Sequence, residues 1–357
     1  MLSKKGKQAL GAIKRAQKAR ALGRWYNLSS ILGNSNWAMF YALLGGRMTG
    51  KSYSLAKRFC TLHRKYGPDG CKLYWLRISD TSTKALLINK AAKLIDPDLV
   101  RKYDLELSVK GSTVFNHGEQ FCDVLALSGM GKQKGLAFYD KDFRGKYCIV
   151  LDEFQLEQGE RRTSFDILYN FIGVLENIGR TTKSNVEVWL VGNTLEEAST
   201  ILKAFNFLPE TFGRFYLKSK RCVIDNMEPT EEYLKDRKGS MADILGGDDM
   251  SNYTNELTKD RRLLDKRRTK HPTAIIKFTT EKRMWFTLWD GRIIKRYHNE
   301  QLPLETDFCM RPHLNSYFSK EKRQAVIDMY DARAIRYDTL ITQSYFSDAM
   351  KSLYQGR

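Results

Sequence analysis

The chain has 357 residues, enough for two domains that each bury a hydrophobic core. Its 60 lysines and arginines exceed its 41 aspartates and glutamates, and the formal net charge of +19 predicts a nucleic-acid partner. No apolar run approaches membrane-spanning length, so we expect a soluble, cytosolic protein without membrane contact. Six cysteines without a CxxC pair, and five histidines without ligand spacing, argue against a structural zinc site.

Residues 1–24 form a basic N-terminal segment. It contains eight lysines and arginines and no acidic residue. We interpret it as an arm that orders on nucleic acid, with a solvated tail as the alternative. Globular composition begins at Trp25 and Tyr26. These two rings are candidates to stack on the adenine of a bound nucleotide, and packing over a sheet edge is the alternative.

A glycine-rich loop lies between an apolar run at 40–44 and a helical pattern at 53–59. Its spacing, GxxxxGK[ST], is that of a loop whose backbone N–H groups surround a β-phosphate. We expect Lys51 to reach the β- and γ-phosphates and the Ser52 hydroxyl to bind Mg²⁺. The sequence therefore predicts an ATP site with Mg²⁺. Its expected nucleotide-binding residues are Gly45, Gly46, Arg47, Met48, Thr49, Gly50, Lys51, Ser52 and Tyr53.

Polar residues follow two further apolar runs. Asp152 and Glu153 come directly after the run at 148–151. We expect Asp152 to hold Mg²⁺ and Glu153 to polarise the attacking water as general base, which favours hydrolysis over binding alone. Asn193 follows the run at 186–191, where it is either a contact to the γ-phosphate or an ordinary turn residue.

Buried-strand patterns alternate with helical or irregular segments in the first part of the chain. This alternation predicts an α/β P-loop NTPase domain over residues 25–228, with a doubly wound, mainly parallel sheet. In that class ligands collect at the carboxyl ends of the strands, where both phosphate-site motifs lie. The expected strands lie at 71–78, 120–127, 148–151 and 186–191.

Two basic residues are candidates to reach the γ-phosphate bound by a neighbouring subunit. Negative charge develops on the γ-phosphoryl oxygens during hydrolysis, and an arginine in trans often stabilises it. Arg180 lies between a predicted helix and the strand that ends at Asn193, and Lys134 lies in a glycine-rich loop. A solvated side chain is the alternative for both.

The second part of the chain differs in composition. Residues 229–265 are rich in charge, glycine and serine, and we interpret them as a linker or lid region. Residues 266–357 predict a smaller α/β domain. Its expected elements are strands at 274–278 and 284–289, a turn at Asp290 into 292–297, and helices at 319–337 and onward to 354.

Basic side chains gather near the predicted hairpin. Such a surface suits contact with DNA phosphates without sequence readout, and a solvated basic face is the alternative. The residues are Lys282, Arg283, Arg292, Lys295 and Arg296.

The order of these motifs resembles the DNA-packaging motor ATPases of tailed bacteriophages, and among them the compact ATPases of small podoviruses. The resemblance covers most of residues 25 to 300 and includes an arginine inside the phosphate loop, Arg47. The segments that carry it are GGRMTGKSYS, VLDEF, VGNT, Leu208-Pro209 with Arg214-Phe215, and the hairpin FTLWDG.

The resemblance implies an additional-strand, ring-forming ATPase that assembles as a homo-oligomer, a pentamer, on the portal vertex of an empty capsid. It would push double-stranded viral DNA inward, in the host cytoplasm and transiently at the prohead vertex. A packaging RNA is a further implied partner for the arm at 1–24. The residues matched to family positions are Lys51, Ser52, Asp152, Glu153 and Asn193, with Arg180 and Lys134 near the positions that act in trans.

Large terminases of other phages also carry a C-terminal nuclease of RNase H-like fold, which needs clustered carboxylates to hold two metal ions. Here the strand at 274–278 has no carboxylate and Asp290 is the only acid on the hairpin. The resemblance therefore implies a degenerate RNase H-like domain without nuclease activity. The alternatives to a packaging motor are a helicase or other DNA translocase, a terminase with an active nuclease, and a basic scaffold that merely retains the glycine loop.

Overall fold

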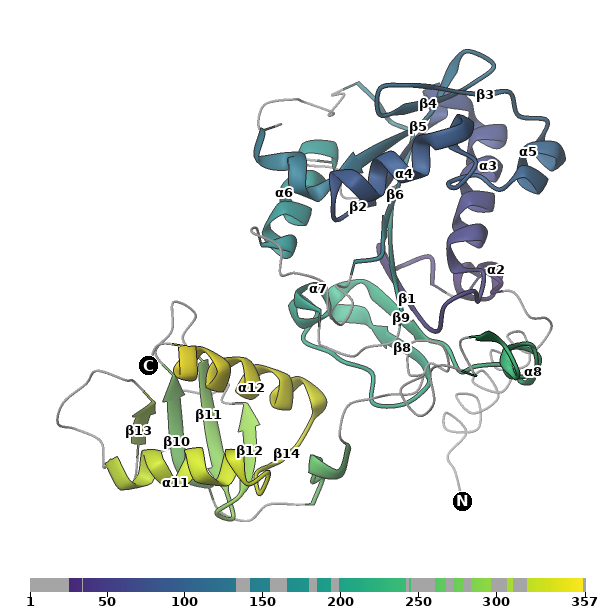
Figure 1. Cartoon of the computed structure of the whole chain (residues 1–357). Helices are drawn as coiled ribbons and strands as arrows, with labels where there is room; N and C mark the ends of the chain where they lie inside the picture. Colours follow the sequence, from purple (N-terminus) through teal and green to yellow (C-terminus); the bar gives the residue numbers. More distant parts are fainter. Residues whose placement is uncertain are drawn as a thin grey trace, which may run out of the picture. The chain divides into compact units, whose positions relative to one another are not determined.

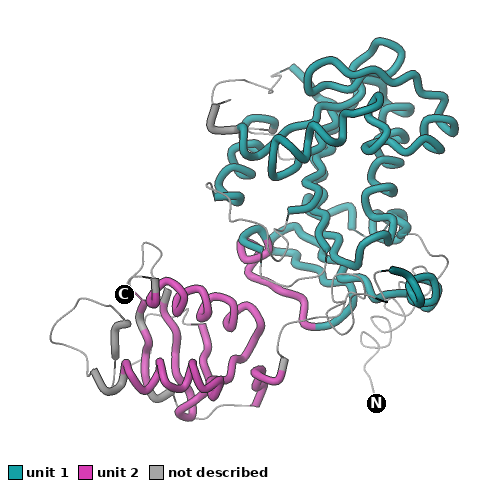
Figure 2. Tube along the Cα trace, in the orientation of Figure 1, with its two compact units in different colours: residues 1–201, 211–257 teal, residues 202–210, 258–357 magenta. Residues whose placement is uncertain are grey.

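The computed structural model describes residues 26–33, 35–132, 142–154, 166–179, 185–193, 199–241, 244, 261–267, 272–278, 284–296, 307–310 and 320–355. The basic arm predicted at 1–24 lies outside these residues. The chain divides into two compact units, one within residues 1–201 and 211–257 and the other within 202–210 and 258–357 (Figure 2). Among the described helices, none is both long enough and apolar enough to span a bilayer.

A nine-stranded sheet forms the centre of unit 1, in the order β3-β4-β5-β2-β6-β7-β1-β9-β8 (Figure 1). The strands from β5 to β9 in this order run parallel, and β3, β4 and β8 are antiparallel additions at the two edges. The predicted α/β class with a large, mainly parallel sheet is confirmed. The strands are Phe40–Leu44 (β1), Cys71–Arg77 (β2), Leu107–Lys110 (β3), Thr113–Asn116 (β4), Glu119–Ala126 (β5), Lys146–Asp152 (β6), Val186–Gly192 (β7), Gly213–Leu217 (β8) and Cys222–Asn226 (β9).

The central strands are continuous apolar runs because both faces of the sheet are covered. Along β6, Cys148 and Val150 belong to the same buried cluster as residues of α3, while the equally buried Ile149 and Leu151 alternate to the other face. In Figure 1, α3 and α6 lie on opposite sides of this sheet. The helices in this part of the sequence are Ser29–Leu32 (α2), Lys51–Gly70 (α3), Asp80–Ala91 (α4), Pro97–Tyr103 (α5), Ile167–Gly179 (α6), Thr200–Ala204 (α7) and Glu231–Arg237 (α8), with 3-10 turns at Leu127–Lys132 and Lys218–Lys220.

Unit 2 contains a five-stranded sheet in the order β13-β10-β11-β12-β14. β10, β11 and β12 form an antiparallel meander, β13 runs parallel to β10, and β14 runs parallel to β12. A second, smaller sheet is thus present, as predicted. The elements are Pro272–Phe278 (β10), Met284–Trp289 (β11), Ile293–Arg296 (β12), Asp307–Met310 (β13), Lys320–Asp331 (α11), Arg336–Tyr337 (β14) and Leu340–Gln355 (α12), with a 3-10 turn at Arg261–Leu263.

The core of unit 2 is aromatic. The rings of Phe278, Phe286 and Phe346 pack edge to face, with centroid separations of 5.1 to 5.8 Å. The helix predicted over 319–337 ends at Asp331, because Arg333 adopts a left-handed conformation (φ 52°) and Arg336–Tyr337 pairs with β12 instead. Tyr337, paired with β12, is buried in the core of unit 2.

A short segment, residues 202–210, belongs to unit 2 although it lies between two stretches of unit 1 in the sequence. The Tyr345 hydroxyl of α12 donates to the carbonyl of Lys203 at 3.1 Å. Three side-chain pairs join the segment to the rest of unit 2. They are Lys203 with Asp348, Asn206 with Arg296, and Glu210 with Lys266.

A buried charge cluster joins α3 to the amino ends of β6 and β7. The Glu187 carboxylate accepts two hydrogen bonds from Arg58, both at 2.9 Å, lies 3.0 Å from the Lys146 ammonium, and accepts from the Cys148 thiol at 3.1 Å. Burial alone would raise the pKa of Glu187, but hydrogen bonding and charge from Arg58, with Lys146, lower it to about 2.

Candidate functional site

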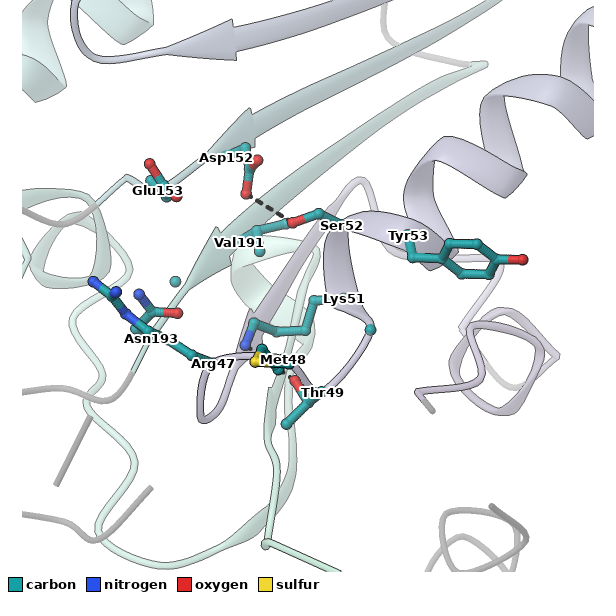
Figure 3. A pocket seen from close by; sticks show the side chains of 12 residues that line it. Arg47, Met48, Thr49, Lys51, Ser52, Tyr53, Asp152, Glu153, Val191 and Asn193 are labelled. Carbon is teal, nitrogen blue, oxygen red and sulfur yellow. Dashed lines mark hydrogen bonds between the residues drawn. The ribbon is translucent and has the colours of Figure 1, made fainter. Parts of the chain in front are cut away.

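The glycine loop leads from β1 into α3 and wraps around Lys51 (Figure 3). The buried Lys51 ammonium donates to the carbonyls of Gly45 at 2.8 Å and Gly46 at 2.6 Å, and to the Thr49 hydroxyl at 3.2 Å. Burial lowers the pKa of Lys51 to about 7, against the opposing charge of Asp152. An ammonium held inside a loop of backbone amides is the arrangement that receives a phosphate.

Two carboxylates stand at the carboxyl end of β6, next to this loop. Asp152 is buried, and the Ser52 hydroxyl donates to its Oδ1 at 3.2 Å (Figure 3). Burial raises the pKa of Asp152, and Arg77, Ser52 and Lys51 act against that shift. Glu153 follows in a left-handed conformation (φ 55°) with 56% of its side chain exposed. A non-glycine residue in that conformation is strained, and such strain is concentrated at functional sites.

Arg77, the last residue of β2, contacts both carboxylates. Its guanidinium donates to Asp152 Oδ2 at 2.8 Å and to Glu153 Oε2. Arg77 is not among the site residues that the sequence predicts. The sequence does hold a signal for it, because Arg77 stands at the end of the strand expected at 71–78, and the parallel strands β2 and β6 bring their carboxyl ends to one edge of the sheet.

The loop and the two carboxylates line one cavity of about 490 Å³. Hard oxygen donors suit Mg²⁺, and the Ser52 hydroxyl beside the Asp152 carboxylate supplies two. The residues present therefore fit a nucleoside triphosphate with its metal ion. The lining residues are Arg47, Met48, Thr49, Gly50, Lys51, Ser52, Tyr53, Asp152, Glu153, Val191, Gly192 and Asn193.

The other predicted site residues lie as follows. Tyr53 contributes to the lining, but its ring points away from the loop and its hydroxyl donates to Asp98 at 2.6 Å (Figure 3). The Tyr26 hydroxyl donates to the buried Asp225 at 2.8 Å, and Tyr26 is not among the residues that line the cavity. Trp25, Arg180 and Lys134 lie outside the described residues.

Two of the basic residues predicted near the hairpin stand over aromatic rings. The Lys295 ammonium lies 4.6 Å from the centroid of the Trp289 ring, and the Arg296 guanidinium 4.1 Å from that of Tyr345. Arg292 is exposed, while Lys282 and Arg283 lie outside the described residues. The described ranges hold no group of three or more His, Cys, Asp or Glu side chains that could bind a metal ion.

Replacing Arg77 by alanine is expected to lower kcat/KM for ATP about tenfold, since the strained Glu153 loses a charged partner that orients it. Arg77→Lys should give an intermediate value, because lysine keeps the charge but not the two-pronged geometry. Steady-state hydrolysis at several Mg²⁺ concentrations measures both variants. Parent-like activity of Arg77→Lys would show that the two-pronged contact is unimportant, and parent-like activity of Arg77→Ala would remove the orienting role from Arg77.

No protein-family model and no curated protein sequence matches this chain. Two solved structures share its fold over nearly its whole length. The bacteriophage phi29 viral genome packaging motor assembly has 17% sequence identity and a TM-score of 0.62, covering 93% of this chain and 100% of that chain. The Phi-28 gp11 DNA packaging motor has 14% identity and a TM-score of 0.58, covering 92% and 98%. The resemblance to phage packaging motors is confirmed at the level of the fold.

Proposed function

We propose that the chain is a genome-packaging motor ATPase, which couples ATP hydrolysis to the movement of double-stranded viral DNA into a preformed capsid. One observation carries the proposal: Lys51, Ser52, Asp152 and Glu153 converge in one cavity at the carboxyl edge of the sheet. The same fold in two phage packaging motors supports the choice of DNA packaging among the processes that ATP hydrolysis drives.

In the proposed site, the loop amides and Lys51 bind the β- and γ-phosphates, and Ser52 and Asp152 hold Mg²⁺. Bound Mg²⁺ would neutralise charge on the phosphate oxygens. Glu153 takes a proton from the attacking water, and the amide of Asn193, which lines the same cavity, contacts the γ-phosphate or that water. Arg77 holds Glu153 until the nucleotide is in place.

The ring, the portal and the DNA complete the proposal. Subunits assemble in a ring, a pentamer, on the portal vertex, with Arg180 or Lys134 reaching the neighbouring subunit's γ-phosphate. A packaging RNA is a further proposed partner, and the C-terminal domain binds DNA without cutting it. The net charge of +19 supports a grip on phosphates that does not read the base sequence.

We expect double-stranded DNA to stimulate steady-state ATP hydrolysis by the purified protein, at concentrations that allow subunits to associate. Because the grip is largely electrostatic, the DNA concentration for half-maximal stimulation should rise steeply with salt. ATP-dependent protection of DNA from an added nuclease, with portal-bearing capsids, then tests packaging. Strand separation would identify a helicase instead, and Mg²⁺-dependent plasmid cutting a terminase with an active nuclease.

A further inference from the structure

The phosphate loop is supported from behind by the chain that follows β9. The Met227 N–H donates to the Leu44 carbonyl at 2.8 Å, which continues the pairing of β9 with β1. The Met227 side chain packs against Gly45, where an added Cβ would lie 3.1 Å from the Met227 Cβ. Helix α8 begins four residues later, so the same segment that backs Gly45 also places α8.

Within α8, the Tyr233 hydroxyl donates to the carbonyl of Arg47 at 2.8 Å. Tyr233 is 2% exposed, so this hydrogen bond is shielded from water. The Arg237 guanidinium lies over the same ring, 5.4 Å from its centroid, and makes a longer contact of 3.5 Å to the Arg47 carbonyl. The Thr230 hydroxyl caps the helix by accepting from the Tyr233 N–H at 3.1 Å. The tyrosine is therefore held in place on several sides.

The position of the Arg47 carbonyl determines where the next N–H points. In a planar trans peptide the C=O and the N–H point in opposite directions. A carbonyl held by Tyr233 therefore turns the Met48 N–H away from α8. Residues 47–53 line the cavity, and α8 supplies none of its described lining residues. Met48 itself lines the cavity, so an N–H directed away from α8 is the group that we expect to meet a phosphate there.

This peptide orientation is strained in the present sequence. Met48 has φ 59°, the left-handed region that glycine adopts freely and a methionine does not. A left-handed residue within a turn gathers successive N–H groups into an anion-binding concavity, so the conformation is useful despite the strain. The conformation is energetically costly for a non-glycine residue, and a hydrogen bond to the adjoining peptide can offset that cost.

We propose that Tyr233 is a positioning residue of the phosphate loop. Its hydroxyl holds the peptide bond between Arg47 and Met48 in the orientation that aims the Met48 N–H at the phosphates of ATP. The inference deepens the proposed function and rests on it. Tyr233 does not touch the nucleotide and acts through the loop backbone.

The test is Tyr233→Phe, which removes one oxygen and keeps the ring under Arg237. We expect ATP binding to weaken about fivefold, the scale of one hydrogen bond, with KM raised by a similar factor and kcat little changed. Inorganic tripolyphosphate, which lacks the base, should lose affinity by the same factor. Tyr103→Phe is the matched control, because its hydroxyl lies 3.0 Å from that of Thr61, ten residues after Lys51 in α3, and neither residue lines the cavity, so both ligands should bind as before.

A second substitution tests the route through Met48. Glycine accepts the left-handed conformation without strain, so in a Met48→Gly background Tyr233→Phe should weaken tripolyphosphate binding less than it does in the parent chain. An equal loss in both backgrounds would overturn the proposal, as would unchanged binding by Tyr233→Phe alone. If the parent chain binds neither ATP nor tripolyphosphate, the proposed function itself fails. That outcome is distinct from failure of the Tyr233 inference, in which the parent chain binds both ligands and Tyr233→Phe binds them equally well.

Discussion

Glu153→Gln is expected to bind Mg²⁺-ATP nearly as well as the parent chain and to hydrolyse it at least about 100-fold more slowly. The substitution keeps the size of the side chain, and a glutamine oxygen can still accept from Arg77, so the strained strand end should stay in place. The substitution removes the carboxylate, which is the group that takes a proton from water. Equilibrium binding of ATP and single-turnover hydrolysis measure the two effects separately.

Asp152→Asn is the informative comparison for that experiment. Asp152 is buried beside Ser52, and its proposed role is to hold the metal ion. Its variant should therefore weaken Mg²⁺-dependent ATP binding, which Glu153→Gln should leave intact. Normal turnover by Glu153→Gln would remove the general-base role from this residue, whatever the comparison variant does.

Glu187→Gln is expected to destabilise unit 1 by on the order of 3 kcal/mol, because it leaves the donors of Arg58 and Lys146 partly buried without their anion. Glu187 is the second residue of β7, and the cavity lies at the opposite end of that strand. The variant should therefore lower stability without changing KM for ATP. Hydrogen exchange of β6 and β7 amides, with chemical unfolding, reports the loss in unit 1 itself.

The effect of Glu187 should depend on pH in a defined direction. Its pKa is about 2 in the folded chain against an ordinary value of 4.5, so the folded state favours the ionised form. The stabilisation is complete above about pH 4.5 and is lost as the pH falls towards about 2. The difference in free energy of unfolding between the parent chain and Glu187→Gln should therefore narrow as the pH falls from about 4.5 towards about 2. Glu176→Gln, at an exposed position of α6, is the control, and an equal stability loss in both variants would contradict the cluster's role.

The sequence predicts the central strands, and it predicts that the glycine loop, Asp152 and Glu153 come together, because these features have strong local signals. The central strands are apolar on both faces, so their runs stand out, and the glycine spacing marks the loop. The edge strand β3 and its neighbour β4 lack that signal, since they are short and partly exposed. The helical pattern extends over Arg336 and Tyr337, but these residues form a strand that pairs with β12. That pairing joins residues far apart in the sequence, so local periodicity does not predict it.

The supporting residues of the site were harder to predict than the residues that line it. Arg77 and Tyr233 are ordinary strand and helix residues in sequence. Their roles depend on partners 75 or more positions away, Asp152 for Arg77 and the Arg47 carbonyl for Tyr233. Side chains that touch a ligand tend to fall in recognisable motifs, whereas those that hold a motif in place are set by tertiary packing alone.

The membership of residues 202–210 in unit 2 bears on how the protein can be divided for study. A fragment that begins at residue 258 omits the segment and leaves Asp348, Arg296 and Lys266 without the partners they have in the whole chain. A fragment that stops at residue 257 retains the segment but loses Tyr345, Asp348, Arg296 and Lys266, which bond to it in the whole chain. Neither piece reproduces a natural unit, so a faithful isolated second domain has to carry 202–210 joined to it by an engineered connection.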